Sequence, residues 1–101
     1  MTFSGGFGRI MSEVIDVIFK ERLKKARTRA GLTQAEAAQK CGFANDAVYR
    51  KYENGRIPTA TTLAVVANAL DVSADWLLGL SRNMEIRDRI PPEEMNANDD
   101  N

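Results

Sequence analysis

One glycine between two short amphipathic segments constrains the fold of this chain more than any other feature. Thr33 and Glu36 precede it with the spacing of a capping box, in which the hydroxyl and the carboxylate each satisfy an amide at a helix start. Gly42 follows, and glycine enters the left-handed conformation that ends a helix without steric cost. Tyr49 and Tyr52 then lie three residues apart, on one face of a second helix. The stretch therefore predicts two short helices joined by a tight turn.

The limits of this helix pair can also be predicted from the sequence. Asn45 or Asp46 can cap the second helix, and Gly55 can end it. Small residues on one face of the first helix allow the second to approach closely: Ala35, Ala38 and Cys41. Two helices with such a turn form the helix-turn-helix, whose second helix enters the major groove of DNA.

Three more helices are predicted around this pair. A helix capped by Ser12 or Asp16 should run to about Ala30, Thr59 should cap another, and Ser73 should cap a short last one. The predicted fold is all-α, a five-helix DNA-binding domain with flexible N- and C-terminal tails. Its expected core residues are Leu23, Leu32, Ala38, Tyr49, Tyr52, Leu63, Leu70 and Leu77.

The length of 101 residues fits one domain. We expect a flexible leader over residues 1–12, the DNA-binding domain over 13–80, and an extension over 81–101 that could dimerise at its start and has a disordered acidic end. No apolar run approaches the length of a membrane span, so the expected location is the cytoplasm. One cysteine and no histidine argue against a disulfide framework and a zinc site, so neither metal nor cofactor is expected.

The formal net charge is zero, but the charges are unevenly distributed along the chain. Residues 20–56 contain ten basic and four acidic residues, a local excess of 10 − 4 = +6. Acidic residues gather at the end of the chain, at 93–94 and 99–100. This asymmetry indicates a basic binding face and an acidic tail.

Residues 19–78 resemble the helix-turn-helix domain of lambdoid phage repressors and Cro proteins, the xenobiotic-response-element family of bacterial regulators. The matching segments are Arg22-Leu23-Lys24 with Arg27, Gly31-Leu32-Thr33-Gln34-Ala35-Glu36, Tyr52-Glu53-Asn54-Gly55, Thr62-Leu63 with Ala69-Leu70, and Val72-Ser73-Ala74-Asp75-Trp76-Leu77-Leu78. The resemblance implies a sequence-specific transcriptional regulator, a repressor that binds double-stranded DNA at an inverted-repeat operator as a homodimer.

The side chains that would read bases lie at the start and on the outer face of the second helix. With both tyrosines turned inward, the helical rotation points Ala47, Arg50 and Lys51 outward. Arg50 or Lys51 can donate to guanine, and Ala47 can touch a thymine methyl group. Asn45 can pair with adenine, and Asp46 can accept from cytosine or serve only as a helix cap.

Other residues receive roles from the resemblance. Gln34 would hold a phosphate and brace the recognition helix, at a helix N-terminus whose amides and dipole suit an anion. The residues expected at the next phosphate are Asn54, Gly55 and Arg56. Arg27 and Glu53 match a structural ion pair of the family. Independently of the resemblance, apolar residues that the core need not bury could form the dimer interface: Trp76, Leu80, Met84 and Ile86. Of these, Trp76 is expected in the core rather than at the interface.

A second class of function is a protein-interaction module. The same fold serves as the antitoxin of toxin–antitoxin pairs, which binds its toxin partner and autoregulates its operon, and residues 81–101 could supply the partner-binding tail. A small toxin gene beside this one would favour that alternative. An enzyme is a poorer interpretation, because the sequence has no histidine, no nucleophile motif and no phosphate-binding glycine loop.

Overall fold

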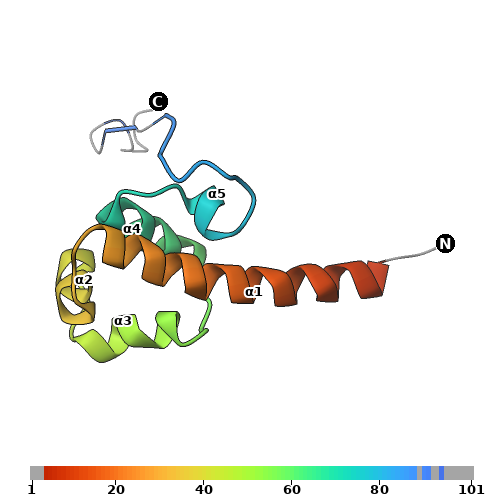
Figure 1. The fold of residues 1–101 in the computed structure, drawn as a ribbon, viewed down its shortest axis with the longest axis horizontal. Coiled ribbons are helices and arrows are strands. Elements are labelled where there is room, and N and C mark those ends of the chain that lie inside the picture. Colours follow the sequence, from red (N-terminus) through yellow and green to blue (C-terminus); the bar gives the residue numbers. More distant parts are fainter. Residues whose placement is uncertain (1–3, 89, 92–93, 95–101) are drawn as a thin grey trace.

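Five α-helices and no strand form the described part of the chain, residues 4–88, 90–91 and 94 of a computed structural model (Figure 1). They are α1 (Ser4–Arg29), α2 (Gln34–Cys41), α3 (Asp46–Glu53), α4 (Ala60–Leu70) and α5 (Ala74–Leu77). The predicted all-α, five-helix fold is confirmed. No helix in this part of the chain is both long and apolar enough to cross a membrane.

The helix starts follow the predicted caps. Thr33 and Glu36 form the capping box, because Glu36 N donates to Thr33 Oγ1 at 3.0 Å and Thr33 N donates to Glu36 Oε1 at 2.8 Å. Of the two candidate caps of α3, Asn45 is the one used, and its Oδ1 accepts from the amide of Val48 at 3.2 Å. Thr59 caps α4 and Ser73 caps α5 in the same way.

Helix α1 lies between two groups of helices. In Figure 1, α3 lies on one side of α1 and α4 and α5 lie on the other, while α2 stands at the end where α1 finishes. Contacts of α1 with both α3 and α5 agree with this central place. The outer side of α3 is therefore turned away from α4 and α5.

The core fills the space between these helices. Its largest fully buried side chains come from α1, α3, α4, α5 and the connection before α5: Phe19, Leu23, Tyr49, Val66, Val72 and Leu77. Most of the predicted core residues are buried, and Leu32 and Leu63 pack partly exposed against its edge. The predicted small face of α2 is wrong in one position, because Ala35 is exposed and Ala37 is buried instead.

The N-terminal part of the chain differs from the expectation. A helix start at Ser12 or Asp16 is wrong, since α1 already begins at Ser4, so residues 4–12 of the expected flexible leader are helical. Extending an existing helix costs little compared with nucleating one, which offsets the low helix propensity of the glycines. An exposed pair between Arg9 and Glu13, four residues apart and 3.7 Å between Nε and Oε2, adds minor support.

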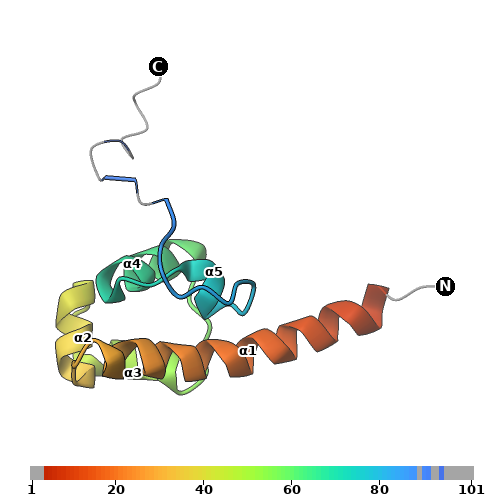
Figure 2. The ribbon, with the colours of Figure 1, turned by 45° about the horizontal axis from the view of Figure 1, so that its top comes forward.

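The segment after α5 returns across the molecule and is held near α5, where the amide of Ser73 donates to the carbonyl of Met84 at 2.8 Å (Figure 2). Met84 packs against the core. Residues 89, 92–93 and 95–101 lie outside the described residues, and they include most of the acidic end and about half of the expected partner-binding tail.

Candidate nucleic-acid interface

The turn between α2 and α3 is fixed by backbone hydrogen bonds and an aromatic contact. Gly42 has φ +78°, and its amide donates to Gln39 O at 3.0 Å. The amide of Phe43 donates to Ala38 O at 2.9 Å, and the Phe43 and Tyr52 rings lie 6.1 Å apart between centroids. These contacts hold α3 at a set angle to α2, as a helix-turn-helix requires.

Helix α3 is divided into a buried face and an exposed face. Tyr49 and Tyr52 are buried against the core. The opposite side carries the predicted base-reading residues at the helix start and over its first two turns: Asn45, Asp46, Ala47, Arg50 and Lys51. All are exposed except Asp46, whose side chain is 42% exposed, so none of the five is buried in the core.

Two of these side chains bind each other. Arg50 Nη1 lies 2.6 Å from Asp46 Oδ2, one helical turn away, and the two side chains are 46% and 42% exposed. Lys51 turns the other way, with Nζ 5.3 Å from the centroid of the Tyr52 ring. An exposed pair of this kind is worth less than about 1 kcal/mol, so Arg50 can exchange its partner for another acceptor at low cost.

The residues implied to meet phosphates lie at the edges of the exposed face of α3. Asn54 caps the end of α3, Gly55 follows with φ +115°, and the amide of Arg56 donates to Lys51 O at 3.0 Å. The side chains of Asn54 and Arg56 are exposed. Gln34 is at the first position of α2 and half-buried, and its Nε2 donates to Glu53 Oε1 at 2.9 Å.

Glu53 connects the first three helices. Arg27 of α1 donates through Nε to Oε2 at 2.6 Å and through Nη2 to Oε1 at 3.2 Å. The Tyr49 hydroxyl of α3 also donates to Oε2, at 2.6 Å, and Gln34 of α2 completes the set. The Glu53 side chain is only 4% exposed and that of Arg27 13%, so this is a largely buried pair with every bond charge-assisted.

The pKa shifts follow from this network. Burial alone would raise the pKa of Glu53, but the hydrogen bonds from Arg27, Tyr49 and Gln34 together outweigh it and lower that pKa. Burial, reinforced by the hydrogen bond to Glu53, raises the pKa of the Tyr49 hydroxyl, which therefore stays protonated as a donor. The hydrogen bond to Glu53 also raises the pKa of Arg27 against the opposing effect of burial.

One structural role was missed by sequence reasoning. Arg22 Nη1 donates to the carbonyls of Trp76 at 2.6 Å and Ser81 at 3.0 Å, and its guanidinium lies 4.9 Å from the centroid of the Trp76 ring. Arg22 and Arg27 therefore stabilise the fold, and they are two of the ten basic residues that the sequence assigned to a binding face. Trp76 itself is buried, so it belongs to the core and is not left over for a dimer interface.

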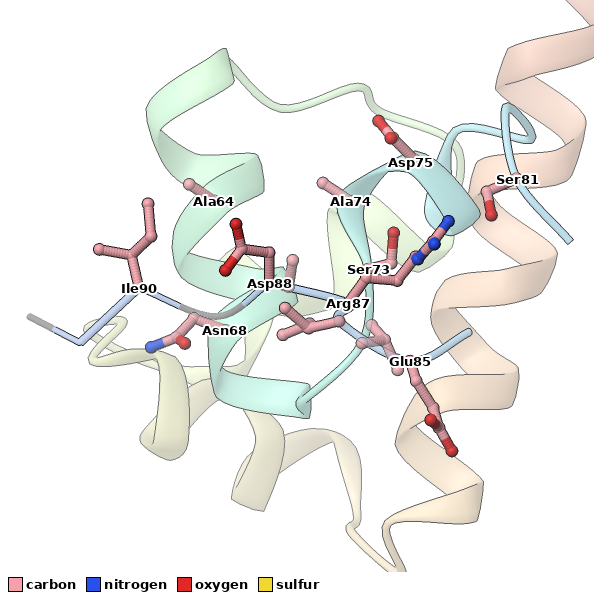
Figure 3. Close-up of a pocket in the computed structure, with 13 residues that line it drawn as sticks. Ala64, Asn68, Ser73, Ala74, Asp75, Ser81, Glu85, Arg87, Asp88 and Ile90 are labelled. Carbon is pink, nitrogen blue, oxygen red and sulfur yellow. The ribbon is translucent and has the colours of Figure 1, made fainter. Parts of the chain in front are cut away.

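A groove of about 650 Å³ lies on the other side of the molecule (Figure 3). It is lined by α4, α5 and the segment after α5, including Asn68, Asp75, Arg87 and Ile90, and by no residue of α2 or α3. The groove is thus separate from the outward surface of α3.

The chain is similar in sequence to known helix-turn-helix proteins. The helix-turn-helix family model matches residues 23–77. The chain is 42% identical over 59 residues to the HTH-type transcriptional regulator ImmR of Bacillus subtilis, covering 58% of this chain and 46% of that protein. It is 41% identical over 61 residues to the cryptic phage CTXphi transcriptional repressor RstR of Vibrio cholerae, covering 59% and 54%.

A third relative is the uncharacterized HTH-type transcriptional regulator YqaE of Bacillus subtilis, 43% identical over 70 residues, or 68% of this chain and 60% of that protein. The chain spans about half the length of the curated relatives it matches. No solved structure gives a significant match. Because the family model covers just over half of the 101 residues, the chain belongs to the helix-turn-helix family of Cro- and repressor-type transcriptional regulators, which includes phage repressors.

Proposed function

We propose that this chain is a cytoplasmic transcriptional repressor that reads an inverted-repeat operator as a homodimer. The observation that supports the proposal is the outward face of α3, a helix that buries Tyr49 and Tyr52 and leaves the side chains of Ala47, Arg50 and Lys51 exposed, within a helix-turn-helix. An α-helix with such a face fits the major groove, where each base pair presents a distinct pattern of donors and acceptors.

The base contacts would be divided among five residues. Arg50 and Lys51 would donate to guanine O6 and N7, and Ala47 would contact a thymine methyl group. Asn45 uses its carbonyl oxygen as the helix cap, which leaves its amide group to donate to a base. Asp46 would accept from cytosine N4 and, until DNA binds, hold the guanidinium of Arg50 beside the helix start.

The phosphate contacts would set the register of the helix in the groove without reading sequence. Gln34 stands at the N-terminus of α2 and is fixed by Glu53, so it can brace α3 while the amides of α2 face a phosphate. Asn54, Gly55 and Arg56 would meet the next phosphate.

A homodimer follows from the small size of one recognition helix. Helix α3 has eight residues, about 12 Å of helix, and reads only a few base pairs. Two copies related by a twofold axis double the site, with half-site centres about 34 Å apart on the same side of the duplex. The sequence selected by such a protein should therefore be palindromic.

Selection of bound sequences from random DNA tests the proposal. We expect an enriched inverted repeat with half-sites about one helical turn apart. Affinity for the enriched site should fall on the order of 10³-fold between about 50 and 200 mM salt, because six or so neutralised phosphates release condensed counterions. A selection without enrichment, or affinity that does not change with salt, would contradict the proposed function.

A further inference from the structure

The N-terminal half of α1 projects beyond the other helices and carries an uncovered apolar surface. In Figures 1 and 2, α1 extends well past α5 toward the N-terminus, at the end opposite α2. At 1.5 Å per residue, the fourteen residues before Ile18 span about 21 Å. Ile10, Val14 and Val17 in this region are 60%, 46% and 50% exposed.

These residues do not face the core of their own chain. At 100° per residue, Ile10 lies about 180° from the buried Phe19 around the helix axis. The apolar residues between positions 10 and 18 occupy about 160° of the circumference, in the angular order Ile15, Met11, Ile18, Val14, Ile10 and Val17. The remaining arc is polar and carries both signs of charge: Arg9, Ser12, Glu13, Asp16 and Lys20.

The same apolar arc is covered where α1 enters the folded domain. The backbone of Gly79 lies directly against Ile18, since a Cβ at Gly79 would be 3.0 Å from Ile18 Cδ1. Arg22, one turn further along α1, is bonded to the carbonyls of Trp76 and Ser81. Leu80 lies between these contacts and is 62% exposed. The exposed Leu80 therefore follows directly on the residue that contacts α1 where its projecting half begins.

We infer that the apolar face of the projecting half of α1, which we call the α1 arm (Ile10, Met11, Val14, Ile15 and Val17), forms the dimer interface together with Leu80 and that a second copy of this chain covers it. Scattered apolar residues are ordinary on a surface, but a continuous apolar face on a projecting helix marks an interaction site.

Three features favour a second copy as the occupant. Ile10, Val14 and Val17 are spaced four and three residues apart. An apolar arc with this spacing can pack against the same arc of a second copy about a twofold axis, so that both subunits use the same surface. The polar arc balances two basic against two acidic residues, so paired arms do not accumulate like charge. The arm also leaves the molecule away from α2, which keeps the outward face of α3 open to DNA (Figure 1).

This inference rests on the proposed function only in assuming that the chain forms a dimer. It is tested by measuring association, without DNA. The full chain and two variants are compared by sedimentation equilibrium. Val14→Glu with Val17→Glu places two negative charges in the arm, and Ser12→Glu places one negative charge on the polar arc. The wild type and Ser12→Glu should be dimers at micromolar concentration. The double variant should raise the dimer dissociation constant on the order of 100-fold.

Because both valines are exposed in the single chain, the domain should remain folded, which the fluorescence of buried Trp76 reports. Leu80→Glu changes the interface without altering α1 and should weaken the dimer as well. A double variant that associates like the wild type, or a monomeric wild type, overturns the inference. A monomeric wild type would also contradict the proposed homodimer, whereas a double variant that associates like the wild type leaves the homodimer in place and rejects only its interface.

Discussion

Glu53 brings together side chains from three helices in a site almost closed to water. Its carboxylate accepts from Arg27 of α1, Gln34 of α2 and Tyr49 of α3, so the orientation of the recognition helix depends on one residue at its end. A buried charge with all its partners contributes modestly to stability, whereas the loss of one partner leaves the other charge unpaired in a poorly solvated place.

Replacement of Glu53 by alanine should therefore lower the free energy of unfolding by about 3–5 kcal/mol, because Arg27 stays behind without a counter-charge. Asp46→Ala offers the matched control, since it breaks the exposed pair with Arg50 and should cost less than about 1 kcal/mol. Urea unfolding followed by Trp76 fluorescence measures both. If both variants lose the same free energy of unfolding, burial of the pair between Glu53 and Arg27 does not make its loss more destabilising.

The lowered pKa of Glu53 also predicts how stability varies with pH. The folded state binds the Glu53 proton less tightly than the unfolded state, so this contribution is complete above the unfolded pKa of about 4.3 and is lost as pH falls through the lower folded pKa. The stability difference between the wild type and Glu53→Gln should be largest near neutral pH and shrink below about pH 4. If the stability difference between the two proteins stays constant in acid, it does not arise from the ionisation of Glu53.

At the scale of the element, the turn between α2 and α3 depends on the left-handed conformation of Gly42. Space is not the constraint there, because a Cβ at Gly42 would meet no atom within 4 Å. Gly42→Ala should therefore cost about 1–2 kcal/mol through backbone strain alone. Gly8, inside α1 and equally uncrowded, is the control, and Gly8→Ala should increase helicity and cost nothing. Thermal unfolding by circular dichroism distinguishes them, and a loss of stability in both would contradict this reading of the turn.

The elements show which parts of the fold can be read from sequence. The caps at Thr33, Thr59 and Ser73 were predicted correctly because a cap depends on residues within one turn of each other. The start of α1 was placed too late, because helix extension overrides the glycine composition that local reasoning relied on. The bonds of Arg22 to Trp76 and Ser81 could not be foreseen, since they join residues more than fifty positions apart.

Across the molecule, the proposed roles fall on different surfaces. The outward face of α3 would meet DNA, the α1 arm with Leu80 would meet a second copy, and the groove beside α4 and α5 lies apart from the α3 face. The division explains how a chain of zero net charge can bind a polyanion, because the basic excess is concentrated in residues 20–56. This explanation of DNA binding does not depend on the charge of the residues after α5.

The most direct test of the account compares Arg50→Ala and Lys51→Ala on the selected operator and on scrambled DNA of the same length, by fluorescence anisotropy at one salt concentration. Each variant should lose about 1–3 kcal/mol of binding free energy on the operator and relax the preference at one base pair, with little change on scrambled DNA. Lys24→Ala on α1 is the control and should weaken both sites nearly alike if it contacts DNA. Should Arg50→Ala and Lys51→Ala lower both affinities by the same factor, the outward face of α3 does not read bases and the central claim is wrong.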